Sequence, residues 1–145
     1  MIKGILRLIL TSVGIACFFQ FFFHQMQSDF VYIFLKSNVT NLQVALLAIN
    51  GATLGIVLTK IRELIDKNGR WEEFESAKME MLLSIKEQMA LIAASLIIIA
   101  LATAKSPPFD LPLDVYQALL LASFVYSLQI LYDTAKSVFV ILDYK

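Results

Sequence analysis

One charged stretch divides this sequence into apolar parts. Residues 60–88 hold six of the 12 basic and seven of the 12 acidic residues in the chain. On both sides of this stretch the sequence stays apolar for about as long as a bilayer crossing requires, which is roughly 20 residues. The stretch therefore has to lie in water, and the apolar runs that flank it have to enter the membrane from the same side.

Hydrophobic residues make up 59% of the 145 residues and the mean hydropathy is +0.73, which leaves too little polar surface for a soluble protein. The apolar windows are Ile5–Phe23, Leu42–Thr59, Met89–Ala104 and Val115–Leu142. The sequence predicts one all-α transmembrane domain over residues 1–145. This domain is an integral membrane four-helix bundle with a cytoplasmic helical hairpin between helices 2 and 3. The predicted spans are residues 5–24, 41–60, 86–105 and 115–136, and the hairpin is residues 60–88.

The basic residues predict the orientation. With the hairpin in the cytoplasm, ten Lys and Arg residues lie inside, and only Lys36 and Lys105 lie outside. Because cytoplasmic loops of membrane proteins carry an excess of basic residues, both termini are expected in the cytoplasm. The N-terminal run ends in a Phe-rich segment without a small-residue cleavage site, so no cleaved signal peptide is expected.

Composition and motifs argue against several classes of site. The formal net charge is zero, so no basic surface for nucleic acid is predicted. One Cys excludes an internal disulfide, and a single Cys with a single His does not indicate a protein-built zinc site. The motifs of phosphate, dinucleotide and hydrolase chemistry are absent from the sequence. We therefore expect no enzyme, no catalytic or metal site and no cofactor, and membrane lipid as one partner.

The second span begins with a capping-box pattern at Thr40 and Gln43 and carries small residues around one amide. Small side chains four positions apart allow close helix contact, and an Asn in hydrocarbon needs a hydrogen-bonding neighbour. The pattern predicts a packing surface, either between copies in a homo-oligomer with the amide turned inward or lining a pore, or between helices of one chain. Its residues are Ala48, Asn50, Gly51, Ala52 and Gly55.

The last span carries a polar stripe. Tyr126, Gln129, Asp133 and Lys136 follow one another at spacings of three, four and three, which places them on one helix face. Asp133 and Lys136 are spaced to form an ion pair. Asp133 lies near the inner end of the span, so an anchor at the headgroups is favoured over a permeation or proton-relay site.

Segments next to the spans suggest further contacts. Phe30–Leu35 is too short to cross a bilayer and is expected either as an interfacial helix or as an extension of the first span. In the hairpin, apolar residues recur at helical spacing, and the apolar end Val138–Leu142 is expected to pack against them under the membrane. These hairpin residues are Trp71, Phe74, Leu82 and Ile85.

Acidic residues beside this apolar stripe have two interpretations. They form either a solvated face or, with Trp71, a surface that contacts a soluble cytoplasmic protein. The residues are Trp71, Glu72, Glu73 and Glu75.

Helix 2 and the hairpin resemble the membrane partner of the lambda Rex phage-exclusion system. The likeness covers residues 45–104 and rests on Gly51-Ala52-Thr53 in an apolar helix, on the following Lys60-Ile61-Arg62-Glu63, and on the size and four-span layout. The resemblance implies a small inner-membrane protein of antiviral defence, of a family proposed to act as ion channels. It identifies no individual functional residue.

Three classes of function follow. The first is a small oligomeric inner-membrane protein of bacterial antiphage defence, acting as a channel or as an anchor for a cytoplasmic partner. The second is an immunity protein that blocks a membrane-inserting toxin, for which the Phe-rich outer end of the first span is suited. The third is a structural subunit of a transport or respiratory complex. A neighbouring gene for a cytoplasmic sensor favours the first class, and a toxin gene favours the second.

Overall fold

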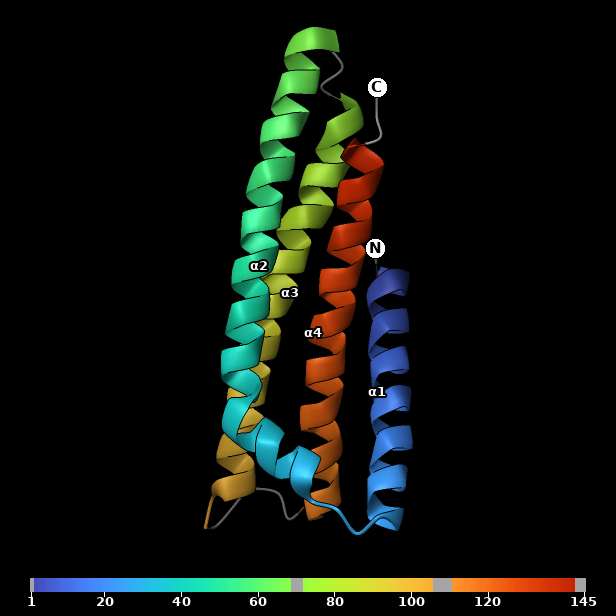
Figure 1. The fold of residues 1–145 in the computed structure, drawn as a ribbon, viewed down its shortest axis with the longest axis vertical. Coiled ribbons are helices and arrows are strands. Elements are labelled where there is room, and N and C mark those ends of the chain that lie inside the picture. The colour runs from blue at the N-terminus through green and yellow to red at the C-terminus, as the bar shows by residue number, and fades with distance from the viewer. Residues whose placement is uncertain (1, 69–71, 106–110, 143–145) are drawn as a thin grey trace.

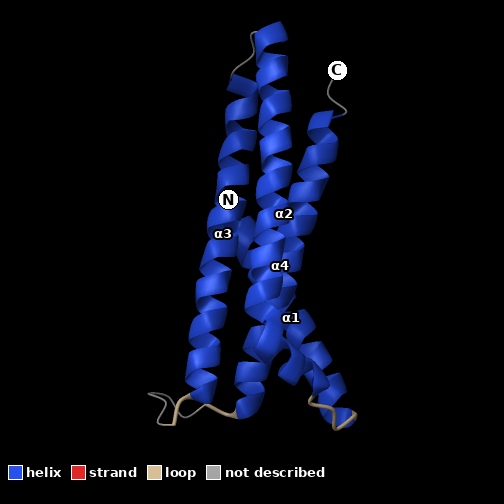
Figure 2. Cartoon of the chain, turned by 60° about the vertical axis from the view of Figure 1, so that its left-hand side comes forward, coloured by secondary structure: helices blue, strands red, loops and turns tan. Residues whose placement is uncertain are grey.

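The structure is a computed structural model that describes residues 2–68, 72–105 and 111–142. Its four helices are α1 (Ile2–Gln25), α2 (Phe30–Asn68), α3 (Glu72–Thr103) and α4 (Leu113–Leu142), and no strand occurs in the described ranges. Figure 2 shows the four helices and the short loop of residues 26–29 between α1 and α2. Each helix is long and apolar enough to cross a membrane, within Gly4–Gln25, Phe30–Glu63, Lys78–Thr103 and Leu113–Lys136. The predicted all-α fold with four candidate spans is therefore confirmed.

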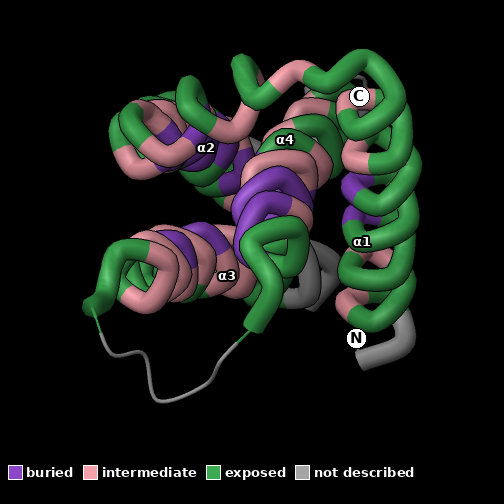
Figure 3. Tube along the Cα trace, turned by 90° about the horizontal axis from the view of Figure 1, so that it is seen from below, coloured by how far each residue is buried: buried purple, intermediate pink, exposed green. Residues whose placement is uncertain are grey.

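The helices run antiparallel in chain order, and α4 packs against α1, α2 and α3 (Figure 1). Viewed along the bundle, the buried segments of α2, α3 and α4 face one another, while much of α1 is exposed (Figure 3). The largest buried cluster joins three helices: Ala16, Leu35, Val39, Leu120, Leu121 and Ala122. Long exposed apolar side chains cover the outside, as expected for helices in contact with lipid.

The structure corrects two expectations about how α2 begins. Phe30–Leu35 forms the first turns of α2. It is therefore neither a separate interfacial helix nor an extension of α1. The reason is that α1 ends at a left-handed residue, Gln27 (φ 49°), with the Ser28 N–H donating to the Phe23 carbonyl at 3.2 Å. Thr40 and Gln43 consequently lie inside α2 and cap nothing. The first turns of α2 are inclined to the rest of the helix (light blue, Figure 1).

The helical form of the predicted hairpin is present. α2 continues to Asn68 and α3 starts at Glu72, and both stand beyond the first residues of α1 (Figure 1). We call the end of the bundle where α2 and α3 connect the hairpin end. The opposite end, where α1 connects to α2, has a pocket that is described below, and we call it the pocket end.

A second buried cluster holds the hairpin end together. It consists of Leu54, Val57, Ile61 and Met81, with Ile65, Ile85 and Val138 packed against it. The predicted contact of the C-terminal segment with the hairpin is therefore present at Val138. Phe139 and Leu82 are exposed, because the helices meet along Met81 and Ile85, and Leu82 lies about 100° around α3 from Met81. Trp71 and the side chain of Phe74 lie outside the described residues.

Candidate functional site

Contacts between α1 and α4 show which residues lie at the same depth. Gln20 donates to Gln117 near the pocket end, and Ser12 donates from Oγ to Gln129 Oε1 at 3.0 Å nearer the hairpin end. One helical turn further along both helices, Arg7 and Asp133 therefore lie at one level. On α3, Glu87 accepts a hydrogen bond from Tyr126 Oη at 3.3 Å. This contact lies slightly nearer the pocket end than Arg7 and Asp133.

These levels define a band without charged side chains. It covers Leu8–Phe23 of α1, Gln88–Ala104 of α3 and Val115–Tyr132 of α4, or about 24–27 Å of each helix at 1.5 Å per residue. The three stretches have nearly equal lengths and coincide in depth, and a hydrocarbon core measures about 30 Å. The band is therefore the part of the bundle that fits a bilayer.

The helix α2 departs from this pattern. Its charge-free stretch, Ser37–Thr59, is about 34 Å long. Asn50 donates from Nδ2 to Gln88 Oε1 at 3.0 Å, so Asn50 lies near the edge of the band, and the following apolar turns extend past that edge. The sequence predicts that the second span ends at residue 60 and that the third span begins at residue 86. In the structure Ile61 packs with Met81, so residues 60 and 86 lie at different depths.

Buried and half-buried polar side chains pair between helices at several depths of the band, and we call them together the polar column. In its middle, Ser95 Oγ and Ser123 Oγ are 2.9 Å apart, and Gln43 Nε2 donates to Ser127 Oγ at 3.1 Å. Toward the pocket end, Gln20 and Gln117 continue the column. Toward the hairpin end it continues through Asn50, which also donates to Ser84 Oγ at 3.3 Å. The column thus links four helices through amides and hydroxyls.

Three buried atoms of this column have no partner among the described residues: Gln43 Oε1, Asn50 Oδ1 and Gln88 Nε2. An unpaired amide atom is costly in hydrocarbon, where water cannot replace the missing hydrogen bond. The atoms comprise two acceptors and one donor, so a water molecule can donate to the acceptors or accept from the donor. The column therefore has unused capacity for polar contacts in its interior.

The predicted polar stripe of α4 divides between two neighbours. Tyr126 is buried and donates to Glu87 of α3, while Gln129 accepts hydrogen bonds from Thr11 at 3.3 Å and from Ser12 of α1. Asp133 and Lys136 are exposed at the edge of the band. The stripe is thus part of the packing of α4 at its buried end and part of the surface at its exposed end.

The predicted packing surface on α2 also divides. Asn50 is fully buried against α3, whereas Ala48, Gly51, Ala52 and Gly55 are exposed on the outer side of α2. An added Cβ at Gly51 or Gly55 meets no atom within 4 Å. Within the described chain, the small residues therefore do not pack against another helix, and the amide does.

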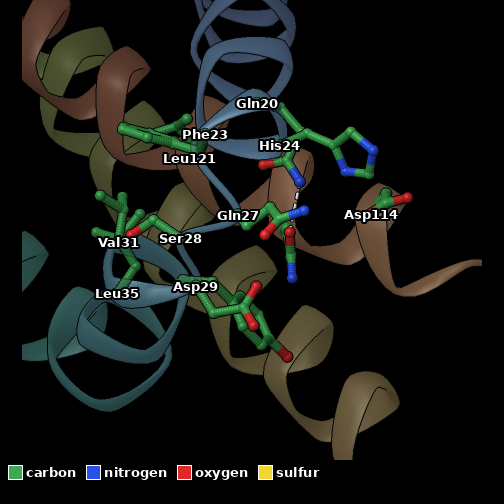
Figure 4. A pocket seen from close by; sticks show the side chains of 12 residues that line it. Gln20, Phe23, His24, Gln27, Ser28, Asp29, Val31, Leu35, Asp114 and Leu121 are labelled. Carbon is green, nitrogen blue, oxygen red and sulfur yellow. Dashed lines mark hydrogen bonds between the residues drawn. The ribbon is translucent and has the colours of Figure 1, made fainter.

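A pocket of about 280 Å³ lies at the pocket end, between α1, α2 and α4 (Figure 4). Gln20, Gln27 and Gln117 line it together with two carboxylates, Asp29 and Asp114. His24 also contributes to its wall. The acidic lining favours small cationic groups, although no three His, Cys, Asp or Glu side chains within the described ranges gather as a metal site would require.

A groove of about 470 Å³ lies between α2 and α3 at the hairpin end. Leu58, Ile61 and Ile65 form its apolar floor. Its two edges carry charges: Arg62 and Asp66 on α2, and Glu75 and Lys78 on α3. Of the predicted partner-contact residues, Glu75 lies at this groove and is exposed. Trp71 and the side chains of Glu72 and Glu73 lie outside the described residues.

No protein-family model, curated protein or solved structure matches the chain.

Sequence reasoning missed most of the polar column. A signal was present, because polar residues seven positions apart lie on one helix face. Gln43 and Asn50 have this spacing in α2, and so do Gln88 and Ser95 in α3. The same spacing relates Ser127 to Thr134 in α4, both of which are buried.

Proposed function

We propose that this chain is a small oligomeric inner-membrane protein of bacterial antiphage defence that anchors a soluble cytoplasmic partner. The observation that carries the proposal is the part of the bundle at the hairpin end that extends past the charge-free band. We call this part the extension; it comprises residues 54–68 of α2, 72–86 of α3 and 136–142 of α4. The resemblance to a phage-exclusion membrane protein supplies the defence context, and the ten-to-two distribution of basic residues supplies the cytoplasmic orientation.

The extension is longer than a connection between spans requires. Helix–helix connections in bundles usually take 2–8 residues. Here α2 continues about 27 Å past Asn50 and packs through Val57 and Ile61 in a buried cluster of its own. A water-exposed helical layer with its own core is suited to binding a soluble protein.

Replacing residues 57–82 with a short Gly/Ser linker tests this function. The four spans retain their contacts inside the band, so we expect membrane insertion to persist. In bacteria that carry the gene with its natural neighbours, we expect the wild-type chain to lower phage plating efficiency and the linker variant to abolish that protection. Equal protection by both chains would contradict the anchor, and a lack of protection by the wild type would contradict the defence role.

The polar column favours conduction of small ions as a second candidate function. Ser95, Ser123 and Gln43 are buried at mid-depth, where apolar packing alone would satisfy a structural bundle. In liposomes loaded with a pH-sensitive or potassium-sensitive dye, conduction predicts a flux that Ser127→Leu reduces. An ion-tight liposome containing folded wild-type protein would contradict this candidate.

A further inference from the structure

We propose that the groove between α2 and α3 binds one amphipathic helix of a soluble partner, with acidic residues on the membrane side and basic residues one turn further out. This inference rests on the proposed anchor function and specifies the chemistry of its partner. The groove residues that carry it are Leu58, Ile65, Arg62, Asp66 and Glu75.

The groove lies past the charge-free band, on the hairpin side of Asn50. Leu58 is eight residues past Asn50, which is about 12 Å beyond the edge of the charge-free band. Headgroups extend only about 5–8 Å from the hydrocarbon. Arg62 and Asp66 lie further out along the same helix. With the bilayer at the charge-free band, lipid tails do not reach the groove floor, and the 39% of Leu58 that is exposed faces water.

The shape and chemistry of the groove suit a helix. Two antiparallel helices form its walls, and its floor is aliphatic, as in grooves that receive the apolar face of an amphipathic helix. On the α2 edge, Arg62 lies nearer the membrane and Asp66 one turn further out. The α3 edge has the same order, because Lys78 lies nearer the membrane than Glu75 in this antiparallel helix. On both edges the basic residue therefore lies nearer the membrane and the acidic residue lies further out.

This charge order argues against a second copy as the occupant. Two copies in one membrane that meet groove to groove lie at the same depth, so basic residues would face basic residues and acidic residues would face acidic ones. Like charges placed against each other weaken association. A partner helix with the opposite order meets both edges with favourable pairs. The order of charges therefore disfavours a groove-to-groove dimer and favours an added helix with the opposite order.

Two designed peptides of identical composition test the assignment. Both have a leucine face flanked by two Glu and two Lys. The ordered peptide carries both Glu in one turn and both Lys in the next. The diagonal peptide carries one Glu and one Lys in each turn. On both edges its charges match a groove in which the order of charges is reversed on α2 and unchanged on α3. Because the ordered helix can enter the groove in either direction, it always finds one complementary placement.

Fluorescence anisotropy with the protein in zwitterionic lipid nanodiscs measures binding. We expect the ordered peptide to bind the wild type at least about five-fold more tightly than the diagonal peptide. Arg62→Asp combined with Asp66→Arg should reverse this preference, and both positions are exposed, so folding is spared. The matched control, Lys60→Glu with Glu63→Lys, swaps an ion pair outside the groove and should leave the preference unchanged.

Three outcomes would overturn the proposal: equal binding of both peptides, binding of both to empty nanodiscs at the same affinity, or disulfide-crosslinked dimers of the Ile65→Cys variant. The last outcome would identify a second copy as the occupant. If the peptides fail while the linker variant still loses phage protection, the groove is wrong and the anchor stands. If the peptides discriminate while the linker variant protects fully, the groove binds helices and the anchor function is wrong.

Discussion

At the scale of single residues, this protein depends on amides and hydroxyls placed where lipid surrounds the bundle. Interhelical hydrogen bonds of this kind hold membrane helices together, since apolar contact between helices gains little over contact with lipid tails. Asn50 shows both sides of this arrangement. Its Nδ2 bonds to Gln88 and Ser84, while its Oδ1 and the Nε2 of Gln88 have no partner among the described residues.

Asn50→Leu should therefore destabilise the bundle, because it leaves the Gln88 amide buried without its partner. We expect a loss of about 0.6–1.7 kcal/mol, between the average and the largest coupling measured for interhelical hydrogen bonds in one membrane bundle. Thermal unfolding in detergent micelles, followed by circular dichroism, measures this loss.

Asn50→Leu combined with Gln88→Leu should recover most of that stability, because no polar group then remains unpaired. Thr59→Val is the matched control, since its exposed hydroxyl bonds only to the Gly55 carbonyl of its own helix. A double variant less stable than the single one would show that the amide pair itself stabilises the fold.

At the scale of elements, α2 is the helix whose role depends on its neighbours. In the sequence, its apolar stretch is typical of a membrane span. In the structure, however, the last turns of this stretch lie past the band and pack in the cluster around Val57 and Ile61. The reason is that apolar side chains satisfy lipid contact and protein contact equally well. Hydropathy therefore cannot separate a membrane segment from the core of a water-exposed helical layer.

Cysteine accessibility tests this depth assignment. In a Cys17→Ala background, Ile56→Cys should react with a membrane-impermeant maleimide, because Ile56 is 67% exposed and lies past the band. Ile97→Cys, 60% exposed but inside the band, should stay protected. Reaction is measured in proteoliposomes against a denatured sample. Equal protection at both positions would place Ile56 in the bilayer, as the span 41–60 predicts.

At the scale of the whole molecule, the exposed small residues of α2 leave room for a second copy. An added Cβ at Gly51 or Gly55 meets no atom of another helix within 4 Å, and both positions are exposed, so we expect a single chain to accommodate leucine there. Leucine is also the better helix former. A close contact between two copies, in contrast, needs the small side chains.

We therefore expect Gly55→Leu or Gly51→Leu to lower the mass of the detergent-solubilised protein while its helix content is unchanged. Ala93→Leu, at an exposed small residue of α3, is the matched control and should keep the wild-type mass. Light scattering coupled to size-exclusion chromatography gives the mass. If both glycine variants retain the wild-type mass, this face contacts lipid and the homo-oligomer is built elsewhere or absent.

The sequence by itself determined the helical class, the four apolar helices and the hairpin that joins α2 and α3. These features depend on local composition, because a bilayer requires long apolar helices and water requires charge. The packing of Val138 on the hairpin also followed from sequence, since an apolar segment past a span needs a surface to cover it.

Only the tertiary structure decided which polar residues meet and at what depth each helix ends. Tyr126 and Gln129 share a stripe in the sequence, but α4 is the central helix and its faces meet different neighbours, α3 and α1. Asn50 separates from Gly51 and Gly55 because successive residues of a helix lie about 100° apart. The groove at Ile65 exists because α2 and α3 continue side by side past the band, and that register is set by contacts between residues distant in the sequence.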